Sequence, residues 1–191
     1  MSPEATAGKL LLFTAPSGAG KTTLVRHLLK TFPERLHFSV SATTRPPRPG
    51  DVHGRDYYFL SPEEFRAGIE RGDFVEYEEV YPGRYYGTLH AEVDRQLAAG
   101  RTVLFDIEVK GATNIRRRYP DNSYAVFVAP PSPEELFRRL RDRNTEDAES
   151  LRVRIARAAE ELGYRDRFDR VLVNDDLDAA LAEAEAIVRA L

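Results

Sequence analysis

The segment whose residue types point most directly to chemistry is a glycine-rich loop near the N-terminus, Ala15-Pro16-Ser17-Gly18-Ala19-Gly20-Lys21-Thr22. It fits the pattern of a phosphate-binding loop, except that alanine replaces the opening glycine. In such a loop the backbone N–H groups of residues 18–20 converge on a polyphosphate, and the N-terminus of the next helix adds its positive dipole end. Lys21 is then expected to reach the β- and γ-phosphates, and the Thr22 hydroxyl suits Mg²⁺. The alternative is an ordinary glycine-rich turn between a strand and a helix.

A second candidate site is the polar, proline-rich segment 39–50 (SVSATTRPPRPG), which is followed by the short motif 54–57 (GRDY). Arg45 and Arg48 lie three residues apart in this segment, and hydroxyl side chains accompany them. Two guanidinium groups in a stiffened loop can bind a phosphate dianion through charge-assisted, bidentate hydrogen bonds. The alternative is a solvated loop whose arginines bind no ligand.

Hydrophobic periodicity predicts the elements that must position these loops. Strands are expected over residues 9–14, 36–40, 57–60, 102–106, 124–129 and 171–173, with a hairpin formed by 74–80 and 85–86. Helices are expected over residues 21–31, 62–70, 89–99, 133–143, 147–167 and 177–191, with one more running through residue 115 and a long loop over 41–56. This alternation predicts a parallel sheet with helices on both faces, interrupted by a more antiparallel insertion.

Composition excludes several classes of protein. The chain carries 28 basic and 31 acidic residues for a net charge of -3, which argues against a broad basic surface for nucleic acid. It has no cysteine, which rules out disulfides and thiolate metal sites. No apolar run approaches the roughly 20 residues needed to cross a bilayer, and residues 1–8 have the character of a flexible tail rather than a secretory signal. We therefore expect a cytoplasmic protein without a membrane contact, and the composition indicates no obligate protein partner.

The two loops together resemble guanylate kinase, a family of phosphate-loop nucleoside monophosphate kinases. The resemblance rests first on the motifs at 17–22, 39–50 and 54–57, in this order. It continues through residues 74–76, 85–88, 106–108, 139–143, 154 and 173–176, and it extends over residues 9–191. It implies Mg²⁺-dependent transfer of the ATP γ-phosphoryl group to GMP, and to dGMP, which gives ADP and GDP in purine nucleotide metabolism.

The resemblance also implies a division of the chain. The expected regions are a nucleotide-binding core (9–40, 88–132 and 161–191), a GMP-binding insertion (41–87) and a helical lid (133–160). The expected fold class is therefore α/β, with a phosphate-loop-type parallel sheet flanked by helices and a mixed or antiparallel insertion.

Nine residues match the family's GMP-binding positions: Ser41, Arg45, Arg48, Tyr57, Glu76, Tyr86, Thr88, Asp106 and Glu108. The two arginines and two tyrosines among them correspond to the clamp that fixes the acceptor phosphate for in-line attack. Glu76 suits guanine because N1–H and the 2-amino group are both donors, whereas adenine presents an acceptor at N1. Glu108 stands where the family usually has aspartate, and we expect the longer side chain still to contact the guanine side.

The remaining site residues serve ATP, the metal and the transferring group. The implied ATP-binding set is Ala15, Pro16, Ser17, Gly18, Ala19, Gly20, Lys21, Thr22, Thr23, Arg143 and Asn174. The implied catalytic set is Lys21, Arg45, Arg139, Arg143 and Arg154, and the implied Mg²⁺ ligands are Thr22 and Asp106, directly or through water. From the residues alone, Asp106 could instead cap the following helix. The lid arginines could instead belong to a solvated, self-paired surface, since nine acidic residues lie between Glu134 and Asp166.

Two rival functions remain at this stage. The first is a binding module of the same fold that has lost catalysis and holds a phosphorylated peptide, but the intact phosphate loop argues against it. The second is a kinase that phosphorylates another phosphate-bearing acceptor, as a related ribose-bisphosphate kinase does. Ser41, Glu76 and Thr88 together favour a guanine acceptor.

Overall fold

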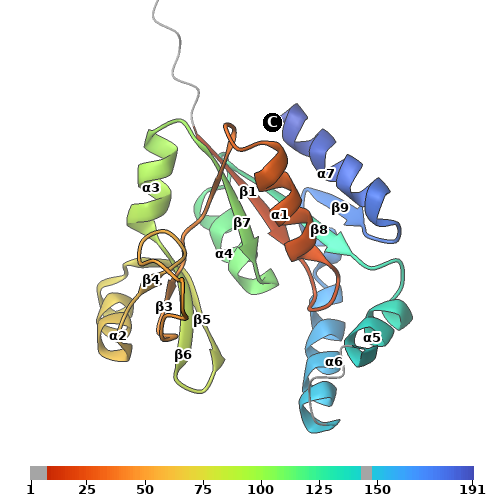
Figure 1. Cartoon of the computed structure of the whole chain (residues 1–191), viewed down its shortest axis with the longest axis horizontal. Coiled ribbons are helices and arrows are strands. Elements are labelled where there is room, and N and C mark those ends of the chain that lie inside the picture. Colours follow the sequence, from red (N-terminus) through yellow and green to blue (C-terminus); the bar gives the residue numbers. More distant parts are fainter. Residues whose placement is uncertain (1–7, 143–147) are drawn as a thin grey trace, which may run out of the picture.

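The computed structural model describes residues 8–142 and 148–191, in which strands and helices alternate along most of the chain (Figure 1). Most of the N-terminal tail and Arg143, which was predicted to belong to the lid, lie outside the described residues. Among the described residues, none of the helices is long and apolar enough to cross a membrane.

The centre of the molecule is a five-stranded sheet with the strand order β2–β7–β1–β8–β9, in which every pair is parallel. Its strands are β1 (Lys9–Thr14), β2 (Leu36–Phe38), β7 (Thr102–Ile107), β8 (Ser123–Ala129) and β9 (Arg170–Val173). All strands of a parallel sheet end at the same edge, so the loops that follow β1 and β7 open side by side.

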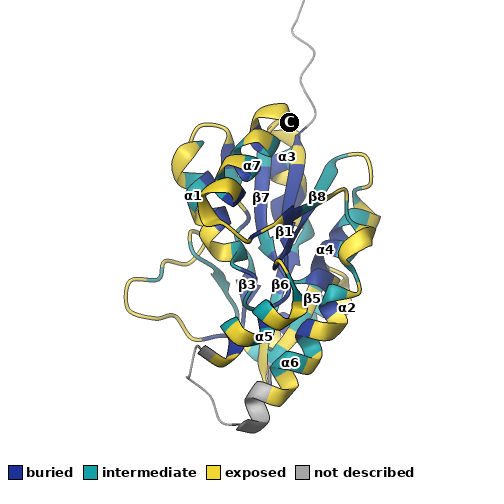
Figure 2. Cartoon of the chain, turned by 90° about the vertical axis from the view of Figure 1, so that its right-hand side faces the viewer, coloured by how far each residue is buried: buried dark blue, intermediate teal, exposed yellow. Residues whose placement is uncertain are grey.

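Helices cover both faces of this sheet: α1 (Lys21–Thr31), α3 (His90–Ala98), α4 (Val109–Arg118) and α7 (Leu177–Ala190). Successive side chains of β1 point to opposite faces, as the period of a strand requires. Leu11 and Phe13 join the hydrophobic cluster that includes α1 and α7, whereas Leu10 and Leu12 join the cluster that includes α3 and α4. Figure 2 shows the result, with buried strands inside and helices whose outer faces are exposed.

A second sheet with the order β4–β3–β6–β5 lies to one side of the first (Figure 1). It consists of β3 (Ala42–Thr43), β4 (Tyr58–Phe59), β5 (Phe74–Tyr81) and β6 (Arg84–Leu89), with antiparallel pairing except between β3 and β4. Helix α2 (Pro62–Arg71) begins with a full capping box and packs its apolar face on this sheet.

Two further helices, α5 (Pro133–Asp142) and α6 (Ala148–Leu162), lie together at the end of the parallel sheet where the second sheet also lies, and α6 contacts β5 (Figure 1). The expectation of one helix over 147–167 was wrong at its end, because α6 stops at Leu162. Gly163 follows, and a short 3₁₀ turn covers Arg165–Arg167. Glycine is a poor helix former, since it loses the most backbone freedom on folding.

The predicted fold class is confirmed, since a parallel sheet flanked by helices carries a mixed second sheet. Two details differ from the prediction. The strand expected over 36–40 ends at Phe38, and the long loop expected over 41–56 contains β3. The pairing of β3 with β4 and β6 is made by residues distant in sequence, which a local pattern does not reveal.

Candidate active site

The glycine-rich loop connects β1 to α1, as the strand–loop–helix pattern requires. Gly18 and Gly20 have φ angles of 94° and 92°, values that side chains of the other residues rarely allow. A Cβ atom on Gly20 would also collide with the Asn174 side chain. The N-terminus of α1 receives no side-chain cap, and a cavity of about 360 Å³ lies over the loop. Backbone N–H groups and a helix dipole are thus available for a phosphate there.

Lys21, Thr22 and Asp106 form one network at the floor of this loop cavity. The Lys21 ammonium lies 2.6 Å from Asp106 Oδ1 and donates to the Ile107 carbonyl at 2.9 Å. The Thr22 hydroxyl donates to Asp106 Oδ2 at 2.9 Å. Asp106 belongs to β7, and its carboxylate does not cap α4, whose N-cap residue is Glu108. Hydroxyl and carboxylate oxygens side by side suit Mg²⁺, which completes its shell with water and phosphate oxygens.

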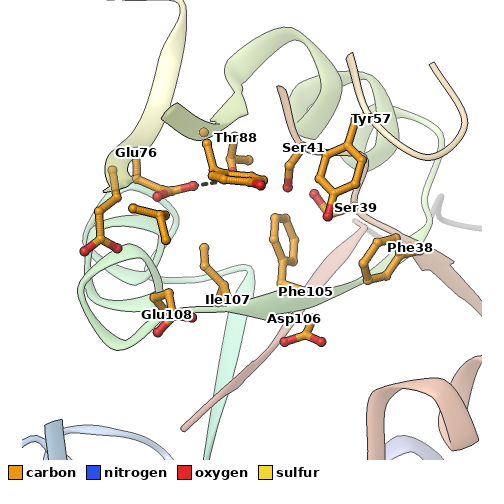
Figure 3. A pocket seen from close by; sticks show the side chains of 14 residues that line it. Phe38, Ser39, Ser41, Tyr57, Glu76, Thr88, Phe105, Asp106, Ile107 and Glu108 are labelled. Atoms are coloured by element: carbon orange, nitrogen blue, oxygen red, sulfur yellow. Dashed lines mark hydrogen bonds between the residues drawn. The ribbon is translucent and has the colours of Figure 1, made fainter. Parts of the chain in front are cut away.

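A second cavity, of about 290 Å³, lies between the two sheets (Figure 3). Seven of the nine predicted GMP-binding residues line it: Ser41, Tyr57, Glu76, Tyr86, Thr88, Asp106 and Glu108. We call this the acceptor cavity. Three of these residues, Tyr57, Asp106 and Glu108, also line the loop cavity, so the two cavities share a wall.

Glu76 is one of the carboxylates that line the acceptor cavity. Its Oε1 atom accepts a hydrogen bond of 2.6 Å from the Thr88 hydroxyl (Figure 3). Burial raises the pKa of Glu76, while the bond from Thr88 opposes that shift. A Cβ atom on Gly111 would lie 2.9 Å from Glu76 Oε2, so this glycine leaves room for the carboxylate. The site therefore offers a partly desolvated acceptor to a ligand with donors.

Serine and apolar side chains complete the acceptor cavity. Ser39 is 3% exposed, and its hydroxyl has no hydrogen-bond partner among the described residues. Phe105 and Ile107 come from β7 and form an apolar floor. A flat ligand with polar edges fits a cavity of this composition.

Arg45 is held in place by hydrogen bonds within its own loop and by a ring contact. Its guanidinium donates to Asp51 Oδ2 at 2.8 Å and to the Pro46 carbonyl at 2.8 Å, and it lies over the Tyr57 ring at 5.2 Å. Asp51 Oδ2 also accepts the Arg48 backbone N–H at 2.8 Å, and these two bonds lower the pKa of Asp51. Asp51 thus orients both halves of the predicted phosphate cradle.

The two cradle arginines, Arg45 and Arg48, differ in how far they are exposed to solvent. Arg45 is 8% exposed and Arg48 is exposed, and neither lines the acceptor cavity itself. Arg45 lies over the Tyr57 ring, which also contacts Tyr86 at 6.0 Å between centroids. Our sequence interpretation missed Asp51, although an aspartate that follows Pro-Gly in a polar loop is a recognisable turn signal.

Two of the predicted lid arginines lie near the glycine-rich loop. Arg154 Nη2 donates to Ser17 Oγ at 2.9 Å, which joins α6 to the glycine-rich loop. Arg139 donates to Glu135 at 2.8 Å and to the Asn174 carbonyl at 3.2 Å. Hydrogen bonds from Arg138 and Arg139 lower the pKa of Glu135 to about 2.

Asn174 lies under the glycine-rich loop. It is 7% exposed, and its Nδ2 donates to the Ala19 carbonyl at 2.7 Å. The side chain therefore supports the loop backbone. A role beside the adenine ring stays a prediction.

Comparison with known proteins agrees with this geometry. The guanylate kinase family model matches residues 7–191. The chain is 50% identical to the guanylate kinase of Bacteroides thetaiotaomicron over 182 residues, which cover 95% of this chain and 89% of that protein. It is 53% identical to the guanylate kinase of Salinibacter ruber over 180 residues, 94% of this chain and 95% of that one. The crystal structure of guanylate kinase from Anaplasma phagocytophilum superimposes with a TM-score of 0.70 at 29% identity, covering 97% of this chain and 86% of that chain.

Proposed function

Because the chain belongs to the guanylate kinase family, we propose that it transfers the γ-phosphoryl group of Mg-ATP to GMP, and to dGMP, giving ADP and GDP. The observation that carries this proposal is the wall shared by the loop cavity and the acceptor cavity. A donor phosphate over the loop and an acceptor phosphate near Tyr57 would be neighbours. In-line phosphoryl transfer depends mainly on such positioning.

On the donor side, the Lys21 ammonium pairs with Asp106. We expect the Lys21 ammonium to turn to the β- and γ-phosphates when ATP binds, which frees an oxygen of Asp106. Thr22 and Asp106 are the residues that would hold Mg²⁺, and their oxygen donors fit that ion. Bound Mg²⁺ supplies charge neutralisation across the phosphate oxygens.

On the acceptor side, Glu76 is proposed to read the base. Its carboxylate can accept from guanine N1–H and from the 2-amino group. The ribose hydroxyls take no part in this contact, so dGMP can make it as well as GMP. Adenine offers an acceptor at N1, so its binding would leave a desolvated charge facing a lone pair. Sites that hydrogen-bond a substrate reject the mismatched analogue by factors up to about 10⁴.

The arginines are proposed to bind the donor phosphates, the acceptor phosphate and the transferring phosphoryl group. Arg45 and Arg48 would hold the acceptor phosphate with Tyr57, and Arg154 already lies beside the loop at Ser17. Arg139 and Arg143 would add charge neutralisation when the lid over 133–160 closes on the core and the insertion. We place this work in purine nucleotide metabolism in the cytoplasm.

The test is an acceptor panel with the purified protein and Mg-ATP. GMP, dGMP, AMP and ribose phosphates are compared by ADP release in a coupled assay, with GDP identified by chromatography and EDTA added as the metal-free control. We expect rapid turnover with GMP and dGMP, none above background with EDTA, and kcat/KM for AMP lower by at least about 10³. Folded protein that makes no GDP would refute the proposal, and preference for a sugar phosphate would favour the rival acceptor.

A further inference from the structure

One guanidinium group lies among three carboxylates just outside the acceptor cavity. Arg157 of α6 donates through Nη2 to Glu78 at 2.9 Å and through Nε to Glu161 at 3.0 Å. Glu108 Oε2 lies 3.7 Å from the same Nη2 atom. The three carboxylates come from β5, from α6 and from the junction of β7 with α4. Arg157 therefore connects the second sheet, the parallel sheet and α6.

Two of these carboxylates, Glu78 and Glu108, line the acceptor cavity, but Arg157 does not. The arginine lies behind that wall, next to a separate crevice of about 300 Å³ between β5 and α6. It can thus affect a ligand in the acceptor cavity only through the residues it holds.

The third carboxylate, Glu161, lies one turn after Arg157 on the same helix and fixes the arginine side chain. Glu161 is 5% exposed, and burial raises its pKa while Arg157 and, more weakly, the backbone N–H of Ser17 oppose that shift. Arg154, one helical turn earlier, bonds the Ser17 hydroxyl. The helix that carries Arg157 therefore also contacts the glycine-rich loop.

The charges that line the acceptor cavity explain why a cation at Arg157 is needed. Four carboxylates line it: Glu76, Glu78, Asp106 and Glu108. Asp106 is paired with Lys21, and Glu76 accepts from a hydroxyl. The other two share Arg157. Without this cation, two adjacent carboxylates would repel each other and the phosphate of an entering ligand.

We propose that Arg157 is a positioning residue for the acceptor site, which holds Glu78 and Glu108 against α6 so that GMP enters a preformed cavity. The proposal rests on the proposed function. Preorganisation of this kind lowers the cost of binding the acceptor without changing the contacts to the transferring group. Loss of Arg157 should therefore raise the KM for GMP and leave kcat and the KM for ATP nearly unchanged.

The experiment compares Arg157→Gln with Arg157→Lys and with the matched control Arg170→Gln. Arg170 makes two similar bonds to Glu183, at 2.9 and 2.7 Å, away from both cavities. For Arg157→Gln we expect the KM for GMP to rise about 5- to 10-fold, since hydrogen bonds between charged groups are strong but this side chain is 37% exposed. Arg157→Lys should recover part of this loss, and the control should change neither KM by more than about twofold.

A double-mutant cycle with Glu78→Gln tests the contact itself. Combining the two changes should cost less than the sum of the single effects on the KM for GMP, because both remove one interaction. An unchanged KM for GMP in Arg157→Gln would overturn the proposal, as would an equal loss in every kinetic parameter together with a lower melting temperature. If the wild-type protein turns over GMP and Arg157→Gln has the same KM for GMP, only the positioning role is refuted. Wild-type protein that does not turn over GMP refutes the proposed function and this role with it.

Discussion

Replacing Glu76 by glutamine is the sharpest perturbation of the proposed acceptor site. The substitution keeps the size of the side chain and still lets Oε1 accept the bond from Thr88. It removes the negative charge and turns one acceptor into an amide donor. Guanine then meets a donor where it presents N1–H or the 2-amino group, whereas the N1 acceptor of adenine gains a partner.

The magnitude follows from the contacts that would be lost. A hydrogen bond to a charged group contributes about 1.5–3 kcal/mol, which corresponds to a decrease of about 10- to 150-fold in kcat/KM for GMP. Activity with AMP should stay constant or rise. The ratio of GMP to AMP activity should therefore fall by more than GMP activity itself.

The pH dependence has a definite sign. Burial raises the pKa of Glu76 above its usual value of 4.5, so kcat/KM for GMP falls as the pH is lowered through that raised pKa. Stability changes in the opposite sense, because the folded protein holds this proton more firmly than the unfolded chain. The stabilising contribution of the protonated form is complete below the unfolded pKa and is lost as the pH rises through the folded pKa. At pH 7 the glutamine variant should be at least as stable as the wild type.

The assay measures kcat/KM for GMP and AMP between pH 4.5 and 8 in wild type, Glu76→Gln and Glu70→Gln. Glu70 is exposed in α2 and gives the same charge change elsewhere in the insertion. Taking the ratio of wild type to variant cancels the titration of the GMP phosphate itself. A glutamine variant that keeps its GMP preference, or one that loses activity only because its melting temperature drops at pH 7, would refute the reasoning.

Three other perturbations separate the parts of the site. Lys21→Ala should lower kcat about 10²- to 10³-fold, whereas Arg48→Ala should mainly raise the KM for GMP; equal effects of both on KM alone in steady-state kinetics would contradict this division. Asp51→Ala frees the cradle loop and should raise the KM for GMP about 10-fold with an unchanged KM for ATP, and a selective effect on ATP would exclude that role. Gly20→Ala forces a side chain into a left-handed conformation against Asn174 and should destabilise the protein by about 1–3 kcal/mol in urea unfolding; a stability equal to wild type would show that the loop can rearrange.

Most elements of the fold follow from local patterns in the sequence. The apolar run of β1, the glycine-rich loop and α1 have the bounds that periodicity and glycine placement predicted. Ser61 and Glu64 form a capping box at the start of α2, and Pro62 occupies its first turn. These signals are local, because a cap or an amphipathic face is encoded within a few residues.

The parts that could not be predicted depend on contacts between distant residues. The two-residue strand β3 exists through its neighbours β4 and β6, and Ala42 and Thr43 alone do not predict a strand. Gly111 is needed where the Glu76 carboxylate approaches α4, a proximity that no spacing reveals. Arg157 lies in a helix rich in charged residues, and composition alone would place such residues at the surface. Only the fold brings Arg157 to Glu78.

The distribution of charge in the acceptor cavity gives the bound ligand a direction. Glu76 lies on one side of the cavity and Tyr57 on the other, with the Arg45 guanidinium 5.2 Å from the Tyr57 ring (Figure 3). An anionic phosphate is repelled by the carboxylate side and attracted to the arginine side, while a base with two donors has the opposite preference. The field therefore favours the orientation in which the phosphate lies at the Tyr57 end of the wall shared with the loop cavity, where Asp106 is paired with Lys21. An acidic cavity can in this way bind an anionic nucleotide and also present its phosphate to the donor.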